Sequence, residues 1–252
     1  MNIPIDLAFI ESTMLAGMRM ITFIMIAPPF STSAFPIRIK AMLAIGLALA
    51  VSPRVTPSYV PLETAQFFLA LISELLIGAL LGFLVMVVFA ALQSAGGLID
   101  LFGGFQLAQA FDPQMMINGA QFTRLFQMTA LALLFASDGY QLIIGGLVRT
   151  FEALPLGGGI DLADPVQAAT GVVTQMFLAS VQIAGPLIVV LFLADAGLGL
   201  LTRVAPALNA FALGFPLKIL LTVTLASIAF VALPQVVSAL TDSAAGLLMG
   251  VK

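Results

Sequence analysis

Long apolar stretches, separated by short polar or proline-containing segments, dominate the chain. Six such stretches cover about residues 7–27, 41–51, 67–92, 125–148, 171–194 and 217–233. A helix needs about 20 apolar residues to cross the roughly 30 Å hydrocarbon layer of a membrane, because it rises about 1.5 Å per residue. The pattern therefore predicts an all-α, polytopic integral membrane protein with about six hydrophobic helical stretches.

Several of these stretches differ from a simple membrane span. The second is followed by Pro53 and Pro57 and is too short to cross the membrane unaided, which is typical of a re-entrant or buried segment. The fourth is interrupted by a Ser-Asp-Gly sequence at 137–139, which indicates a broken helix or a short hairpin. We expect Pro216 to break the chain before the sixth stretch and Pro234 to lie near its end. Several of the helical stretches should therefore be broken or short.

The segment between the third and fourth stretches, residues 93–121, is not an ordinary polar loop. It reads QSAGGLIDLFGGFQLAQAFDPQMMINGAQ, with glycine pairs at 96–97 and 103–104 and only two charges, Asp100 and Asp112. Glycine pairs allow sharp turns, and Met and Phe repack easily. An apolar, irregular segment at membrane depth must be buried in protein or line a cavity. Two interpretations follow: a plug or gate, or a packed connector between two spans.

The composition supports the membrane class and excludes several kinds of chemistry. The chain is 61% hydrophobic and 8% charged, whereas soluble domains carry about a quarter charged residues. It has no cysteine and no histidine, which removes disulfides, thiolate metal sites and the commonest general base. It also has no basic tract of the kind that binds nucleic acid. We therefore expect no enzyme activity, no catalytic residue, no metal, no cofactor and no nucleic-acid partner.

A few ionisable residues lie within the apolar stretches. They are Glu74 in the third stretch and Asp195, Arg203 and Lys218 in the segment 191–221. A carboxylate facing lipid costs about 2–3 kcal/mol or more, so Glu74 should face protein or water. We expect all four to be buried charges with a structural or assembly role, and Asp195 to pair with Arg203 or Lys218. A role for Glu74 in conduction stays open.

Two small residues on the third stretch indicate a helix contact. Gly78 and Gly82 are four residues apart, so they lie on the same face of a helix. Small residues at this spacing let the backbones of two membrane helices approach closely. We therefore expect another helix to pack against this face.

Four sequence motifs resemble those of a known family. The motifs are APPFSTSAFPIRIKAMLAIGLALAVSP at 27–53, SELLIGALLGF at 73–83, GGLIDLFGGFQLAQAFDPQ at 96–114 and FLADAGLGLLTRVAPALNAFALGFPLKI at 192–219. On these residues the chain resembles the FliR/SctT family of type III secretion export-gate subunits. Ala207 departs from the expected Pro-Gln pair, and residues 137–140 replace a more usual Gly-Gly-His-like stretch.

The resemblance implies a fold, partners and a location. Residues 1–252 would form a single membrane export-gate domain, with a FliP-like part over about 1–165 and a FliQ-like helical hairpin over about 166–252. The chain would assemble with FliP and FliQ around a conduit for unfolded exported proteins, and FlhB and FlhA would be further partners. The location would be the bacterial inner (cytoplasmic) membrane, in the flagellar basal body, in contact with membrane lipid.

The resemblance also favours the plug over the connector. In the family, the loop between the third and fourth stretches occludes the pore, which corresponds here to residues 103–118. An apolar constriction of this kind excludes water and ions but can yield to a passing chain. The candidate plug residues are Gly103, Gly104, Phe105, Phe111, Met115 and Met116.

A secondary transporter of a small solute is the alternative function. Broken helices and buried charges such as Glu74, Asp195 and Lys218 are typical of substrate sites in transporters. Against this function, the two halves of the chain share only one short echo, in which residues 34–39 resemble residues 214–219.

Overall fold

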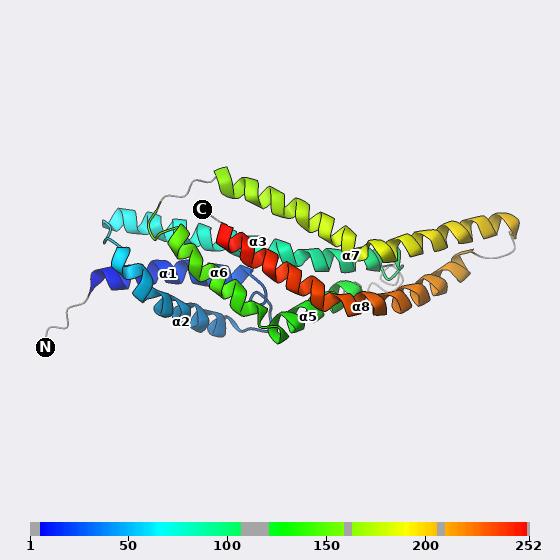
Figure 1. Cartoon of the computed structure of the whole chain (residues 1–252), viewed down its shortest axis with the longest axis horizontal. Coiled ribbons are helices and arrows are strands. Elements are labelled where there is room, and N and C mark those ends of the chain that lie inside the picture. Colours follow the sequence, from blue (N-terminus) through cyan, green and yellow to red (C-terminus); the bar gives the residue numbers. More distant parts are fainter. Residues whose placement is uncertain (1–5, 107–120, 159–162, 206–209, 251–252) are drawn as a thin grey trace. The chain divides into compact units, whose positions relative to one another are not determined.

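A computed structural model describes residues 6–106, 121–158, 163–205 and 210–250 (Figure 1). In these ranges every regular element is a helix. The helices are α1 (Leu7–Ile26), α2 (Ile37–Val55), the short 3₁₀ helix η1 (Thr56–Ser58), α3 (Thr64–Phe102), α5 (Gln121–Ala136), α6 (Gly139–Ala153), α7 (Ala163–Val204) and α8 (Ala210–Gly250). The all-α prediction is therefore confirmed.

Five helices in the described ranges are long and apolar enough to cross a membrane. They are α1, the segment Ile37–Ser58, α3, and the segments Ala169–Val204 of α7 and Leu213–Gly250 of α8. The pair α5 and α6 would make a sixth span if it is counted as one broken helix. The sequence prediction of a polytopic membrane protein with about six hydrophobic stretches is confirmed.

The break between α5 and α6 lies at the predicted Ser-Asp-Gly sequence. α5 ends at Ala136 and α6 begins at Gly139, while Asp138 adopts a left-handed conformation with a φ of 56°. Asp is one of the few non-glycine residues that tolerate this region. The Asp138 carboxylate accepts a hydrogen bond from the Gln141 side-chain amide at 3.1 Å. The predicted interruption at 137–139 is confirmed, and the 77° bend between the two helices fits either a broken span or a re-entrant hairpin.

The second stretch is longer than its apolar core predicts. Pro53 lies inside the last turn of α2, and its missing N–H leaves the Leu49 carbonyl without its usual donor. The Ser52 hydroxyl donates to that carbonyl at 3.0 Å and so replaces the lost bond. The helix therefore continues to Val55 and then into η1. The prediction of a segment too short to span is wrong.

The third stretch also continues further than predicted. α3 runs without interruption to Phe102, so the glycine pair at 96–97 is helical and the turn expected there is wrong. A Cβ on Gly96 would lie 2.6 Å from the Thr123 Cα atom in α5. Gly96 is thus a place where two backbones approach closely. Only the second glycine pair, at 103–104, ends the helix.

The last helix likewise passes through its prolines. α8 includes Pro216 and Pro234 and ends only at Gly250, so the predicted break and end at these residues are wrong. Proline is tolerated within apolar membrane helices when neighbouring groups satisfy the freed carbonyls. α7 likewise continues through Pro186 to Val204.

The chain divides into two compact units that share α3, α7 and α8. The first comprises Met1–Val88, Ser137–Val173 and Leu240–Lys252, and the second comprises Phe89–Ala136 and Thr174–Ala239. This is a division by contacts within one chain. The predicted division at about residue 165 into FliP-like and FliQ-like parts is a division by resemblance, and it stays a prediction.

In the first unit, α1 and α3 pack closely at the predicted glycine face. A Cβ on Gly78 would fall onto the Thr22 hydroxyl and the Arg19 carbonyl, and a Cβ on Gly82 would lie 3.0 Å from the Ile26 Cβ atom. The expected helix contact at Gly78 and Gly82 therefore forms, and its partner is α1. The fully buried side chains of α1 that line this core include Leu15, Met20, Phe23 and Ile24.

Candidate functional site

The base of the predicted plug segment is built at the end of α3, within the second unit. Gly103 packs against α8, since a Cβ there would lie 2.7 Å from the Thr222 hydroxyl oxygen. Gly104 has a φ of 82° and would bring a Cβ to 3.3 Å from the Phe215 ring. Glycine is favoured at both positions, by close approach at Gly103 and by the left-handed backbone at Gly104. The second glycine pair therefore fixes where the helix ends and how the chain leaves it.

One buried residue, Asp100, joins the two ends of this segment through its backbone carbonyl and its carboxylate. The Asp100 backbone carbonyl accepts from the Phe105 N–H at 3.0 Å. The Asp100 side chain accepts from the Phe122 N–H at 2.9 Å, and from the Thr123 N–H and hydroxyl at 3.0 Å each. It thus satisfies free N–H groups in the first turn of α5 and complements the positive end of its dipole. Asp100 is fully buried, so the residues before and after 107–120 are held at one point.

An aromatic row continues from this point into the core of the second unit. Phe105 packs edge to face on Phe122, with ring centroids 5.2 Å apart. Phe122 contacts Phe126 at 6.4 Å, and Phe126 contacts Phe230 of α8 at 5.7 Å. Edge-to-face pairs of this kind contribute about 0.5–1.5 kcal/mol each beyond the area they bury. Phe105 therefore belongs to a packed row in this chain.

The structure describes only part of the predicted plug. Gly103, Gly104 and Phe105 lie within the described residues. Phe111, Met115 and Met116 lie outside them. Sequence inspection noted Asp100 only as one of two charges in the segment, and it missed its role in joining the two ends. The available signal was an acid at the end of a long apolar helix, where a buried carboxylate needs donors.

Glu74 belongs to a buried polar cluster in the first unit. Its Oε2 accepts from the Arg19 Nε of α1 at 2.6 Å, and both side chains are fully buried. Its Oε1 lacks a hydrogen bond of standard geometry among the described residues, although the Gly157 N–H approaches the carboxylate. Removing one member of a buried ion pair strands the other charge, so the pair links α1 to α3 strongly.

Arg19 also caps the end of α6. Its Nη2 donates to the Leu154 carbonyl at 2.9 Å and its Nη1 to the Thr150 carbonyl at 3.3 Å. Its guanidinium lies 4.2 Å from the centre of the Phe151 ring. A cation at the C-terminus of a helix satisfies free carbonyls and complements the negative end of the dipole. Sequence inspection predicted an ion pair or hydrogen bond for Glu74 but did not name Arg19 as the partner.

The other predicted charges lie on the α7–α8 hairpin of the second unit. Lys218 Nζ and Asp195 Oδ2 form an ion pair at 2.7 Å. The Asp195 side chain is 46% exposed in the chain by itself, and Arg203 is also exposed. The expectation that these two charges are buried within the chain is therefore wrong. α7 carries few buried neighbours at this point, and a role of these residues in assembly stays a prediction.

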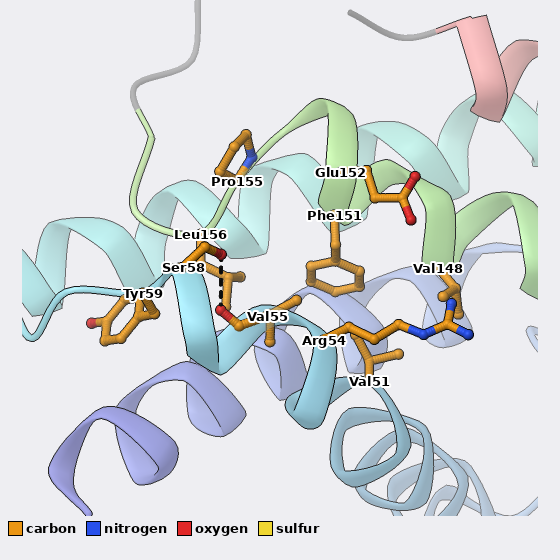
Figure 2. Close-up of a pocket in the computed structure, with 10 residues that line it drawn as sticks. All are labelled: Val51, Arg54, Val55, Ser58, Tyr59, Val148, Phe151, Glu152, Pro155 and Leu156. Carbon is orange, nitrogen blue, oxygen red and sulfur yellow. Dashed lines mark hydrogen bonds between the residues drawn. The ribbon is translucent and has the colours of Figure 1, made fainter.

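A groove opens in the first unit between the end of α2 and the end of α6 (Figure 2). Its volume is about 440 Å³, within the range of small-ligand sites. The residues that line it are Val51, Arg54, Val55, Ser58, Tyr59, Val148, Phe151, Glu152, Pro155 and Leu156. The Tyr59 hydroxyl donates to Glu11 at 2.9 Å. Burial raises the pKa of the Tyr59 hydroxyl above its ordinary value, and the hydrogen bond to Glu11 raises it further. The phenol therefore stays protonated.

Long apolar helices, and ion pairs between them, define the chain as an all-α integral membrane protein. It belongs to the family described as bacterial export proteins, family 1, which it matches over residues 10–244. The resemblance to the FliR/SctT family is thereby confirmed. The family match thus agrees with the class of protein that the sequence motifs indicate, a membrane component of a bacterial export apparatus.

Curated relatives match over most of their length. The chain is 34% identical to the flagellar biosynthetic protein FliR of Escherichia coli (strain K12) over 208 residues, which cover 82% of this chain and 80% of the relative. It is 28% identical to FliR of Caulobacter vibrioides over 209 residues, with 82% and 83% covered. It is 27% identical to the Yop proteins translocation protein T of Yersinia pestis over 179 residues, with 70% and 69% covered.

Proposed function

We propose that this chain is a core subunit of the flagellar type III export gate. It assembles with FliP and FliQ to form the conduit for unfolded flagellar proteins, in the bacterial inner membrane within the basal body. The observation that carries the proposal is the family match over residues 10–244. The flagellar assignment is supported by the higher identity to FliR of Escherichia coli, 34%, than to the Yop translocation protein, 27%.

The exposed apolar surface of the last two helices supports assembly with other subunits. Within the chain, only 22% of the most apolar 18-residue stretch of α7 is buried, and only 17% of that of α8. The corresponding share in α3 is 61%. Exposed side chains on these helices include Phe177, Leu178, Phe192, Leu193 and Val231. Contiguous apolar surface of this kind requires lipid or protein to cover it. FliP and FliQ would cover part of it, and FlhB and FlhA are further partners.

The proposal includes a pore plug formed by residues 103–118. Its support is the fixed base of the segment, where Asp100 binds Phe105 near the start of the segment and Phe122 and Thr123 after its end, and where Gly104 directs the chain out of α3. A short, fixed base restrains how far a segment can move from the pore axis. Energy for export would come from other components, because the chain carries no phosphate-binding loop and no catalytic arrangement that its sequence reveals.

The decisive experiment shortens residues 103–118 in cells that also produce FliP and FliQ. We expect the complex to form, as shown by co-purification, and the membrane to leak small ions and solutes. A matched control replaces Gly97 with Ala, outside the segment, where an added Cβ meets only ordinary contacts at 3.6 Å. If the complex forms and the membrane stays tight, the segment is a connector and the seal lies in another subunit.

The same material tests the alternative function. A secondary transporter would take up a small solute when the chain is reconstituted alone, and would not need FliP or FliQ. An export-gate subunit would be recovered in a hetero-oligomer and would show no such uptake. Recovery of a fully stable, solute-transporting chain without partners would contradict the proposed function.

A further inference from the structure

The groove between α2 and α6 has an apolar floor and a charged rim. Val51, Val55 and Phe151 are buried and form its floor, whereas Arg54 and Glu152 are exposed. Figure 2 shows the Phe151 ring between these two charged side chains. An apolar centre with polar groups at its edge is typical of a surface that binds another polypeptide.

Neither rim charge has a partner among the described residues. The ion pairs in the described ranges are Arg19–Glu74 and Lys218–Asp195. No hydrogen bond in these ranges involves the side chain of Arg54 or Glu152. Both side chains are thus free to bind groups of opposite charge.

The lining of the groove leaves few polar groups for a small ligand. The Tyr59 hydroxyl donates to Glu11, and the Ser58 hydroxyl donates to the Val55 carbonyl at 3.1 Å. Small-molecule sites converge a few polar groups on the ligand from within the pocket, whereas here the free groups lie at the edge. A polypeptide segment fits better, because it can carry an apolar side chain between an acidic and a basic residue.

An exposed row of residues on α2 leads to the rim of the groove. Met42, Gly46, Ala50 and Arg54 follow one another at four-residue spacing, and all are exposed. A Cβ on Gly46 would meet nothing within 4 Å. Helices pack along rows of this spacing, and small residues in the row let a second helix come close. The row therefore gives another helix room to lie along α2 with one end at the groove.

We propose that a helix of a neighbouring export-gate subunit docks along α2 and ends in this groove. It carries an acidic side chain that binds Arg54, a basic side chain that binds Glu152, and an apolar side chain that packs on the Phe151 ring. Charge-assisted bonds are among the strongest polar contacts in proteins, and complementary charges fix the register of two surfaces. Such docking rests on the proposed function, because it needs a second subunit of the same apparatus.

The test is site-specific photocrosslinking in cells that produce the full chain together with FliP and FliQ. A photoreactive amino acid takes the place of Ser58, which lines the groove and is exposed. We expect an adduct with the mass of this chain plus FliP or FliQ. Arg54→Gln and Glu152→Gln should each lower the adduct yield about tenfold, the effect of one lost charge-assisted bond on a binding constant.

Matched controls remove exposed charges that lie outside the groove. Glu63→Gln in the first unit and Arg124→Gln in the second leave the groove lining intact and should not change the adduct yield. A further variant tests the row on α2. Gly46→Leu should lower the yield about fivefold or more through overpacking against the partner. Measured in the chain alone, it should unfold no lower than the unsubstituted chain, because a Cβ there meets no neighbour.

The outcomes separate this docking from the proposed function. If FliP and FliQ do not co-purify with the unsubstituted chain, both fail. If they co-purify but the adduct contains lipid or a second copy of this chain, the docking is overturned and the export-gate function stands. An adduct whose yield is the same in Arg54→Gln, Glu152→Gln and the two controls would also overturn it.

Discussion

Replacing Gly78 with Ala should destabilise the first unit, although the same change normally stabilises a helix. Alanine is favoured over glycine in a helix by about 0.5–1 kcal/mol. At Gly78, however, the added Cβ would fall onto the Arg19 carbonyl and the Thr22 hydroxyl. The carbonyl is backbone and cannot rotate away, so α1 and α3 must separate.

The size of the effect follows from overpacking and from the buried pair beside it. Inserting a methyl group into a packed contact costs about 1–3 kcal/mol. Separation also pulls Arg19 away from Glu74, to which it is bound at 2.6 Å. Compared with a Gly→Ala change that meets no neighbour, we expect a loss of about 1.5–4 kcal/mol in the free energy of unfolding. Gly82→Ala should cost less, because its nearest contacts begin at 3.0 Å.

The assay is thermal unfolding in detergent, followed by far-UV circular dichroism because the chain has no Trp. The matched control is Gly46→Ala in α2, where a Cβ would meet nothing within 4 Å. We expect Gly46→Ala to unfold at the same temperature as the unsubstituted chain or above it, and Gly78→Ala to unfold several degrees lower. If the two variants unfold at the same temperature, the close α1–α3 contact is not present in the protein.

Three further predictions concern the polar contacts and the end of α3. Glu74→Leu should lower the free energy of unfolding by about 3–5 kcal/mol, because it leaves the buried Arg19 charge without its partner. The double variant Glu74→Leu, Arg19→Met should regain most of this stability in thermal unfolding. A double variant that is no more stable than the single one would refute the pairing. Asp100→Ala should lower the free energy of unfolding by roughly 2–3 kcal/mol through lost hydrogen bonds. It should also speed amide hydrogen exchange at the start of α5. Unchanged exchange there would contradict the bond between Asp100 and the first turn of α5. Gly104→Ala should cost about 1–2 kcal/mol in unfolding free energy, because its φ is 82°, whereas Gly97→Ala should cost nothing; equal effects would show that the left-handed turn is absent.

The class of protein could be predicted from the sequence because it depends on properties of single segments. Apolar length decides whether a helix can cross a membrane, and the six stretches carry that information without knowledge of their neighbours. The break at Asp138 could be predicted for the same reason, since it results from the local preference of a Ser-Asp-Gly sequence. The family motifs are likewise a property of the sequence alone.

The ends of helices were harder to predict because they depend on whether neighbouring groups make up for a helix-breaking residue. Pro53 is tolerated because the Ser52 hydroxyl serves the carbonyl that proline leaves free. The first glycine pair stays helical because α5 packs against Gly96, whereas Gly104 turns the chain. The two pairs look alike in sequence, and only their neighbours in space distinguish them.

The sequence by itself determined the membrane class, the family and the presence of a buried acid in α3. Only the tertiary structure decided which groups stabilise that acid and what Asp100 holds together. Arg19 is 55 residues from Glu74, and it also reaches the end of α6 131 residues away. In a low-dielectric interior each buried charge needs specific donors, but periodicity does not reveal which distant residue supplies them. That choice depends on which helix faces meet, and close approach at residues such as Gly78 is what brings them together.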